Sequence, residues 1–336
     1  MKKYLSARRA QSIIEKFGRA RVLVVGDLIM DHFIWGKVKR ISPEAPVPVV
    51  EVTSESIMLG GAANVVNNIH SLGGRSLVTG VVGNDSDGKK LVASLKEKGI
   101  PADGIVTDRK RPTTIKTRII AHHQQVVRFD REMRDRIDPE ATDKVLKYIK
   151  KAARSADVVV VSDYAKGLVT QRLMDETNSL CRDMGKPVAI DPKVEHFDFY
   201  RGSSIVTPNN LEAGQGSGIE ITDDESLHRA GQALFSRLGC QALLVTRGEN
   251  GMSLFEPGRE THIPTVAQEV FDVSGAGDTV IGTLALALAA GASYREAAVL
   301  ANFAAGVVVG KIGTATLTPV ELLKAAQSNL RTGLPK

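Results

Sequence analysis

The hydrophobic pattern alternates along the chain between continuous apolar runs, typical of buried strands, and apolar positions at helical spacing. Glycine or a short polar turn separates most of these segments. This alternation predicts a mostly parallel sheet with helices on both faces, a three-layer α/β fold. The expected strands are 21–27, 75–83, 157–164, 186–192, 204–209 and 240–248, and the expected helices are 62–74, 88–99, 139–156, 170–185, 223–239, 276–290 and 294–310.

Two segments interrupt the alternation. Residues 32–56 and 108–131 are rich in β-branched residues and lack a helical period. We expect them to form a small β-sheet that stands off the main body as a lid. The whole chain, 1–336, is then one domain carrying this lid, since no linker, low-complexity tract or internal repeat divides it.

Composition narrows the class of protein. The 336 residues are 43% apolar, which suits a globular α/β domain with a substantial core. The net charge of +6 raises the question of nucleic-acid binding, but 38 acids are interspersed among the 44 Lys and Arg, and aromatic residues make up 4%. This pattern, with no nucleic-acid motif, argues against a nucleic-acid partner and fits small anionic substrates.

Location and cysteine content give further expectations. The basic N-terminus lacks the apolar core of a signal peptide, and no apolar run is long enough to cross a membrane. We therefore expect a cytoplasmic protein without a membrane partner. Cys181 and Cys240 are far apart and form no metal or redox motif.

Most of the unusual polar motifs directly follow a predicted strand. In parallel α/β sheets, ligands bind at the carboxyl ends of the strands, so these motifs are candidates for one site. The alternative is that loops are polar in general. The motifs are Gly26-Asp27 leading to Asp31, Ser162-Asp163-Tyr164, Asp191-Pro192-Lys193, Thr207-Pro208-Asn209 and Thr246-Arg247-Gly248.

The stretch FDVSGAGDTVIGT, residues 271–283, places almost no side-chain bulk at the start of an apolar helix. The first N–H groups of a helix lack internal partners and carry partial positive charge, so Gly275, Ala276 and Gly277 offer an anion site. Asp278 beside them could accept a proton from an attacking hydroxyl while the N–H groups hold a phosphoryl group. The alternative is a glycine-rich turn with Asp278 as a capping residue.

Asn209 and Glu212, three residues apart, share one helix face and form a candidate metal and phosphate site. Mg²⁺ prefers oxygen ligands and keeps several waters, so Glu212 would act through water. The alternative is a capping box with Asn209 as the N-cap, and the two roles are compatible.

Two further glycine-containing motifs have both a functional and a structural interpretation. Gly60 and Gly61 permit close backbone approach, and Asn64 suits sugar hydroxyls, but a turn with an exposed Asn is the alternative. The segment from Thr246 through Gly248 to Gly251 could lie against a nucleotide or be an ordinary hairpin.

A basic cluster falls in the expected lid. It could bind a substrate phosphate, although the favoured interpretation is a solvated sheet edge whose charges prevent strand aggregation. Its members are Arg109, Lys110, Arg111, Lys116 and Arg118.

Together these motifs resemble the PfkB, or ribokinase-like, family of sugar kinases over essentially the whole chain. The resemblance rests on LGGAANVVNNIHSLGG, VTGVVGNDSDG and DVSGAGDTVIGTLALAL. The stretch GDLIMDHFIWGKVKRISPEAPVPVVEV, supported by DPKVEHFDFYRG and TPNNLEA, is similar to the family members that phosphorylate D-glycero-β-D-manno-heptose 7-phosphate for ADP-heptose and lipopolysaccharide core synthesis.

The resemblance implies a ribokinase-like fold, ATP and Mg²⁺ as cofactors, a sugar phosphate as substrate, and a homodimer formed through the lid. It implies that Asp278 is the catalytic base and that Gly275, Ala276 and Gly277 form its anion hole. The expected substrate-binding residues are Asp31, Gly60, Gly61, Asn64, Arg128, Asp163 and Lys193. The expected nucleotide-binding residues are Asn209, Glu212, Thr246, Gly248, Gly251 and Asn302. Candidates for binding the 7-phosphate are Lys193, Lys116, Arg118 and Arg128.

The chain departs from the family pattern at several points. Val273 stands where a Thr is common, and AGQGSG after Glu212 is poor in apolar residues for a buried helix. The chain has no His-x-Gly-His motif, so we expect the kinase alone, without the nucleotidyltransferase domain of bifunctional relatives. The alternatives are another sugar kinase of the family, such as a ribokinase or fructose-phosphate kinase, or a non-catalytic nucleotide-binding regulator. The turn GDLIMD disfavours an oxidoreductase.

Overall fold

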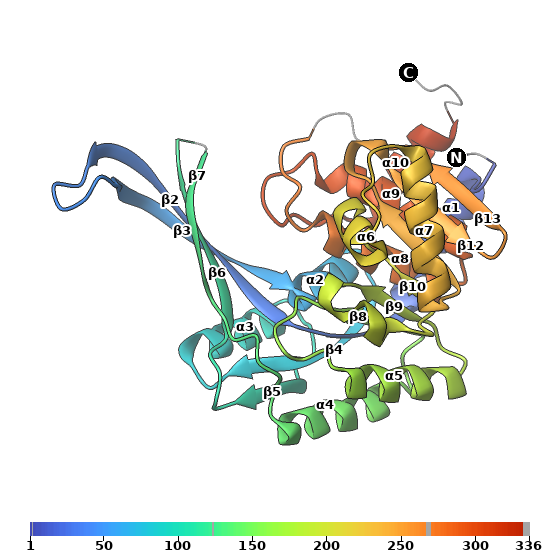
Figure 1. The fold of residues 1–336 in the computed structure, drawn as a ribbon, viewed down its shortest axis with the longest axis horizontal. Coiled ribbons are helices and arrows are strands. Elements are labelled where there is room, and N and C mark those ends of the chain that lie inside the picture. The colour runs from blue at the N-terminus through green and yellow to red at the C-terminus, as the bar shows by residue number, and fades with distance from the viewer. Residues whose placement is uncertain (2, 123, 267–269, 332–336) are drawn as a thin grey trace.

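The computed structural model describes residues 1, 3–122, 124–266 and 270–331. These residues form a large sheet covered by helices and a second sheet that projects from it (Figure 1). The expected α/β fold with a mostly parallel sheet and a small additional sheet is confirmed.

The large sheet has nine strands. Its strands are parallel except at one edge, where β12 and β13 run antiparallel to their neighbours. The strand order is β13 (Arg259–Ile263), β12 (Met252–Glu256), β11 (Ala242–Thr246), β10 (Ile205–Val206), β9 (Val188–Asp191), β8 (Val158–Ser162), β1 (Arg21–Gly26), β4 (Arg75–Gly83) and β5 (Gly104–Asp108).

Helices cover both faces of this sheet, which explains its continuous apolar runs. In β1, Val22 and Val24 point into one core, and Leu23 and Val25 point into the other. The first core is covered by α1 (Ala7–Ile14), α2 (Ala62–Ser71), α3 (Ser86–Glu97), α8 (Ala276–Ala289), α9 (Tyr294–Val308) and α10 (Pro319–Arg331). The second is covered by α4 (Pro139–Ala152), α5 (Gln171–Asp183), α6 (Asn210–Ser217) and α7 (Asp224–Leu238).

The second sheet, called the lid sheet below, has four strands. Their order is β3 (Pro48–Gly61), β2 (Leu28–Ile41), β6 (Thr114–Ala121) and β7 (Gln124–Arg131). It is larger than the two segments expected from sequence, because β2 begins directly after β1 and β3 runs straight into α2. Residues 109–113 connect β5 to β6, so Arg109, Lys110 and Arg111 lie at the base of the lid sheet rather than in it.

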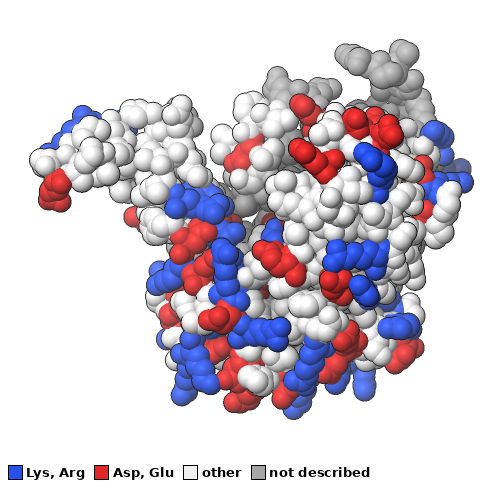
Figure 2. All heavy atoms as spheres, viewed as in Figure 1, with Lys and Arg blue, Asp and Glu red and all other residues white. Residues whose placement is uncertain are grey.

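Surface charge is mixed. Figure 2 shows Lys and Arg interspersed with Asp and Glu over the main body, while much of the projecting lid sheet is uncharged on this face. Among the described residues, no helix has the length and hydropathy of a membrane span.

Candidate active site

The carboxyl ends of neighbouring strands bring acidic side chains together. Strands β1, β8 and β9 are adjacent and parallel, and Asp27, Asp163 and Asp191 stand at their ends. Helix α8 packs against all three strands, so Asp278 in its first turn faces the same region. The topology thus gathers motifs that are far apart in the sequence.

Asp278 is the third residue of α8 and is 3% exposed. Its two carboxylate oxygens accept hydrogen bonds from Asn64 Nδ2 at 2.7 Å and from the Tyr164 hydroxyl at 2.8 Å. Burial raises the pKa of Asp278 to about 6, although both hydrogen bonds favour the charged form. A carboxylate with this pKa is ionised at neutral pH and able to take up a proton.

The start of α8 is open, as its composition predicts. Gly275 is the N-cap at φ +76°, a left-handed conformation that favours glycine. A Cβ at Gly275 would come within 2.7 Å of Asn64 Nδ2, whereas a Cβ at Gly277 would meet no atom of the described residues outside its own helix within 4 Å. The N–H of Ala276 donates to the carbonyl of Val273 at 3.2 Å. The open space therefore lies beside Gly277, next to Asp278.

Asn64 is completely buried, and its amide is oriented by a chain of hydrogen bonds. The Thr279 hydroxyl donates to Asn68 Oδ1 at 2.8 Å, and Asn68 Nδ2 donates to Asn64 Oδ1 at 3.3 Å. The NH₂ group of Asn64 is thereby directed to Asp278. In this geometry the Asn64 amide holds the carboxylate, and its contact with a sugar hydroxyl stays a prediction.

The lid sheet contributes Asp31 from β2 and Arg118 from β6. Arg118 Nη1 lies 2.5 Å from Asp31 Oδ1. Glycine at position 60 leaves room for this carboxylate, because a Cβ there would collide with Asp31 Oδ2. Gly61 has φ +55°, and a Cβ there would lie 2.6 Å from the carbonyl of Asp27. The two glycines therefore allow strand β3 to lead into α2 close to the acidic side chains.

Asp163 is 1% exposed, and protein donors occupy its carboxylate. The N–H of Ala165 donates to one oxygen at 2.7 Å, while His196 Nδ1 at 2.7 Å and the Tyr200 hydroxyl at 2.6 Å contact the other. A direct contact with substrate, as expected from sequence, is disfavoured by this arrangement. Asp163 instead anchors the loop that follows β8.

Four cationic side chains expected near a substrate phosphate differ in their partners. Arg118 pairs with Asp31, Arg128 with Asp130 at 3.2 Å, and Lys193 with Glu212 at 2.8 Å. Within the described part of the chain Lys116 forms no ion pair; its ammonium lies 5.4 Å from the centre of the Tyr164 ring. Burial lowers the pKa of Lys116, and the nearby Lys166 and Arg128 lower it further.

Asn209 and Glu212 form the capping box at the start of α6. Asn209 Oδ1 accepts from the N–H of Glu212 at 2.9 Å, and Glu212 Oε2 accepts from the N–H of Asn209 at 3.0 Å. The other oxygen of Glu212 pairs with Lys193. Burial raises the pKa of Asp191 well above its usual value, and the carboxylates of Asp278 and Glu212 raise it further. This excess of carboxylate charge fits a hydrated Mg²⁺ ion, although no group of three or more candidate ligands is preassembled among the described residues.

Sequence comparison relates this chain to known proteins. The model of the pfkB family carbohydrate kinases matches residues 19–321. The chain belongs to the PfkB family of carbohydrate kinases. It is 48% identical to the bifunctional protein HldE of Geobacter sulfurreducens over 320 residues, and 47% identical to that of Geotalea uraniireducens. Each alignment covers 95% of this chain but 65% of the relative, so the chain spans just under two thirds of their length.

Solved structures show the same fold. Arabidopsis thaliana ribokinase, complexed with ribose and ATP, has a TM-score of 0.73 at 20% identity, covering 92% of this chain and 99% of that one. Escherichia coli phosphofructokinase-2, in complex with potassium, has a TM-score of 0.77 at 18% identity, covering 93% and 99%. The ribokinase-like fold expected for this PfkB kinase is confirmed.

Most of the residues expected to bind nucleotide lie at or just after the ends of β10 and β11. Asn209 and Thr246 form a parallel bridge that extends the pairing of these strands. Gly248 and Gly251 flank the short turn to β12, with φ +55° and +77°. Asn302 of α9 is 3% exposed and donates to the carbonyl of Pro264 at 2.8 Å. Contact of these residues with a nucleotide stays a prediction for this PfkB kinase.

Tyr164 is the main site residue without a role in the sequence interpretation. The motif Ser162-Asp163-Tyr164 marks it as a strand-end residue, but nothing local shows that its hydroxyl reaches Asp278. The sequence likewise identifies Asp27 only as a strand-end residue. The structure shows that its buried carboxylate accepts hydrogen bonds from the N–H groups of Tyr164 at 2.9 Å and Lys166 at 3.1 Å.

Proposed function

We propose that this PfkB kinase transfers the γ-phosphoryl group of ATP to the anomeric hydroxyl of D-glycero-D-manno-heptose 7-phosphate, giving heptose 1,7-bisphosphate for ADP-heptose and lipopolysaccharide core synthesis. The observation that carries the proposal is the Asp278 carboxylate, held by two donors beside the open space at Gly277. The choice of heptose rests on the resemblance of residues 26–52 and on the HldE relatives.

The chemistry follows from this arrangement. Asp278 accepts the proton of the C1 hydroxyl while the oxygen of that hydroxyl forms a bond to the γ-phosphorus of ATP. The bond between the γ-phosphorus and the β,γ-bridging oxygen breaks, and ADP leaves. The N–H groups at the start of α8 hold the transferring group. An anomeric hydroxyl is more acidic than other sugar hydroxyls, which suits a carboxylate whose pKa is about 6.

Glu212 and Asp191 are the residues proposed to hold a hydrated Mg²⁺ ion near the ATP phosphates, where the ion would neutralise phosphate charge. Lys193, paired with Glu212, lies on the same side and fits the nucleotide phosphates. Asp31 would bind sugar hydroxyls through the oxygen that faces Gly60.

Lys116 is the proposed ligand of the 7-phosphate. It comes from the lid sheet, is partly buried and lacks an acidic partner within the described residues. A buried cation without a partner is costly, and an incoming phosphate would relieve that cost. The phosphorylated heptose should therefore be a much better substrate than the free sugar.

We further propose that the lid sheet closes over the substrates and forms a homodimer interface. It exposes large apolar side chains on an otherwise mixed surface, and such patches mark protein contacts. The exposed residues are Ile41, Val47, Val52, Ile57, Val126, Val127 and Phe129.

The test is to measure ATP consumption against a panel of sugars and sugar phosphates, followed by phosphorus NMR of the product. We expect heptose 7-phosphate to be preferred and the new phosphate to be at C1. A new phosphate at another carbon, or equal turnover of unphosphorylated sugars, would favour another sugar kinase of the family. No ATP consumption with any sugar would favour a regulator.

A further inference from the structure

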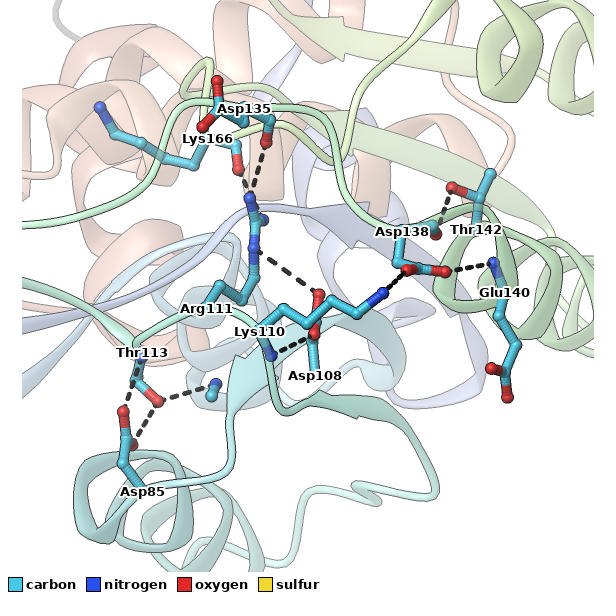
Figure 3. Close-up of polar contacts among 11 residues, drawn as sticks. Asp85, Asp108, Lys110, Arg111, Thr113, Asp135, Asp138, Glu140, Thr142 and Lys166 are labelled. Carbon is cyan, nitrogen blue, oxygen red and sulfur yellow. Dashed lines mark hydrogen bonds and ion pairs between the residues drawn. The ribbon is translucent and has the colours of Figure 1, made fainter.

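Two chain segments join β6 and β7 of the lid sheet to the helices and strands beneath it. Residues 109–113 lead from β5 into β6, and residues 132–138 lead from β7 into α4. Figure 3 shows the polar contacts that tie these segments down. Asp85, the N-cap of α3, accepts the N–H of Thr113 at 2.9 Å and its hydroxyl at 2.7 Å, and Lys110 reaches Asp138 at 2.5 Å.

Arg111 lies at the centre of these contacts, with 8% of its side chain exposed. Its Nη1 donates to the carbonyl of Lys166 at 2.8 Å, and its Nη2 donates to the carbonyl of Asp135 at 2.7 Å (Figure 3). One guanidinium thus links the 109–113 connection to the 132–138 connection and to the loop that follows β8. The planar fork can serve two acceptors at once, which an ammonium on a flexible stem does less well.

The loop that follows β8, residues 163–169, is bonded to the 132–138 connection at further points. The N–H of Ile137 donates to the carbonyl of Gly167 at 3.0 Å. Gly167 has φ +91°, and a Cβ there would collide with the carbonyl of Asp135. Lys166 pairs with Glu132 at 2.7 Å. Because of the close approach at Gly167, a shift of this loop would also require a shift of the 132–138 connection.

The same loop supports Asp278, the proposed catalytic base. The N–H groups of Tyr164 and Lys166 both donate to Asp27, and Ala165 between them has φ +52°, an unusual conformation for alanine. This places the Tyr164 hydroxyl 2.8 Å from Asp278 Oδ1. Contacts therefore run without a break from Arg111, through the loop, to the carboxylate.

We propose that Arg111 is a positioning residue that fixes the Tyr164 loop to the base of the lid sheet and thereby holds the Asp278 carboxylate in its reactive orientation. The inference rests on the proposed role of Asp278 as the base. Arg111 touches neither Asp278 nor the open space at Gly277; it acts through the main chain of Lys166 and the hydroxyl of Tyr164.

The physical basis is the loss of hydrogen-bond donors. Without the guanidinium, the carbonyls of Lys166 and Asp135 lose charge-assisted hydrogen bonds, and the one to Lys166 is partly buried. The 163–169 loop is then free to shift, and the hydrogen bond from Tyr164 to Asp278 lengthens. That hydrogen bond lowers the pKa of Asp278, so its weakening should raise the pH at which the base becomes active.

The experiment compares Arg111→Met with Arg109→Met, Tyr164→Phe and the Arg111→Met/Tyr164→Phe double variant. Arg109 is the matched control, because it carries the same charge in the same connection and makes no hydrogen bond or ion pair within the described residues. The readouts are kcat, the acid limb of kcat/KM against pH, and Tm. The other charged groups that act on Asp278, namely Asp31, Lys116 and Asp191, are present in every variant.

We expect Tyr164→Phe to lower kcat by about 10- to 100-fold, the loss of one hydrogen bond to a charged group. Arg111→Met should lower kcat by about 10-fold, and both should move the acid limb to higher pH. In the Tyr164→Phe background Arg111→Met should add little, because both act through one contact. Arg109→Met should resemble the unaltered enzyme.

The proposal is overturned if Arg111→Met matches Arg109→Met in kcat and pH profile, or if its full effect persists in the Tyr164→Phe background. If Arg111→Met does not fold, Arg111→Lys is measured instead, with the same expected direction and the same grounds for rejection. Asp278→Asn separates the two levels: normal turnover would remove the base assignment, whereas an inactive Asp278→Asn with silent Arg111 variants would remove this proposal alone.

Discussion

Gly277→Ala is the most informative single change at the proposed anion hole. The added methyl group would meet no atom of the described residues outside its own helix within 4 Å, and Gly277 lacks a positive φ, so the fold accommodates it. Alanine also has a higher helix propensity than glycine, by roughly 0.5–1 kcal/mol. The free energy of unfolding should therefore be unchanged or slightly higher, and Tm should not fall.

Turnover should respond in the opposite direction. If the transferring phosphoryl group approaches the N–H groups at the start of α8, the methyl group occupies that space. Blocking the approach to one donor of such a site should cost as much as removing that donor, about 10²–10³-fold in kcat. Gly282→Ala is the matched control, because it lies in the same helix and its Cβ would make ordinary contacts at 3.5 Å. Steady-state kinetics and thermal unfolding of both variants decide the matter, and normal turnover of Gly277→Ala would refute the anion hole.

Three further predictions concern magnesium, the substrate phosphate and the lid sheet. Glu212→Gln keeps an acceptor for the N–H of Asn209 but loses the charge. The magnesium concentration that gives half-maximal rate should therefore rise while Tm changes little. An unchanged magnesium titration would leave Glu212 with its capping role alone. Lys116→Met should reduce kcat/KM for heptose 7-phosphate by about 10- to 100-fold and spare the unphosphorylated sugar, and an equal effect of Arg128→Met, whose side chain is already paired, would remove the assignment. Hydrogen exchange at 32–56 and 108–131 should slow when both substrates bind, and unchanged protection in both segments would argue against closure.

The order of strands and helices was predictable because both cores impose their period on the sequence. The run RVLVVG sends successive apolar side chains alternately into two separate cores, which is why its pattern predicts a buried parallel strand. Helices α1 and α10 were not predicted, although Ser6 and Thr318 accept hydrogen bonds from the first turns and are recognisable caps. The glycine-rich α6 is explained by packing, because a Cβ at Gly216 would come within 2.5 Å of the Phe197 ring.

The candidate site was predictable at the level of motifs but not of individual contacts. Asp278 and the glycines before it could be found locally, since a helix start with little side-chain bulk is visible in the sequence. The role of Asn64 could not, because the direction of its amide depends on Asn68 and on Thr279, more than 200 residues away. The same holds for Asp163, whose carboxylate is occupied by His196 and Tyr200 from a later segment.

Asp278 is proposed to take the proton of the attacking hydroxyl. The most direct measurement is the turnover of Asp278→Asn with ATP and heptose 7-phosphate, with ATP binding measured separately. We predict a loss of at least about 10²–10⁴-fold in kcat with ATP binding retained, since general-base catalysis contributes that much. In the unaltered enzyme kcat/KM should rise with pH through about 6, because Asp278 must lose its proton to act. Near-normal turnover of Asp278→Asn would show that Asp278 is not the base.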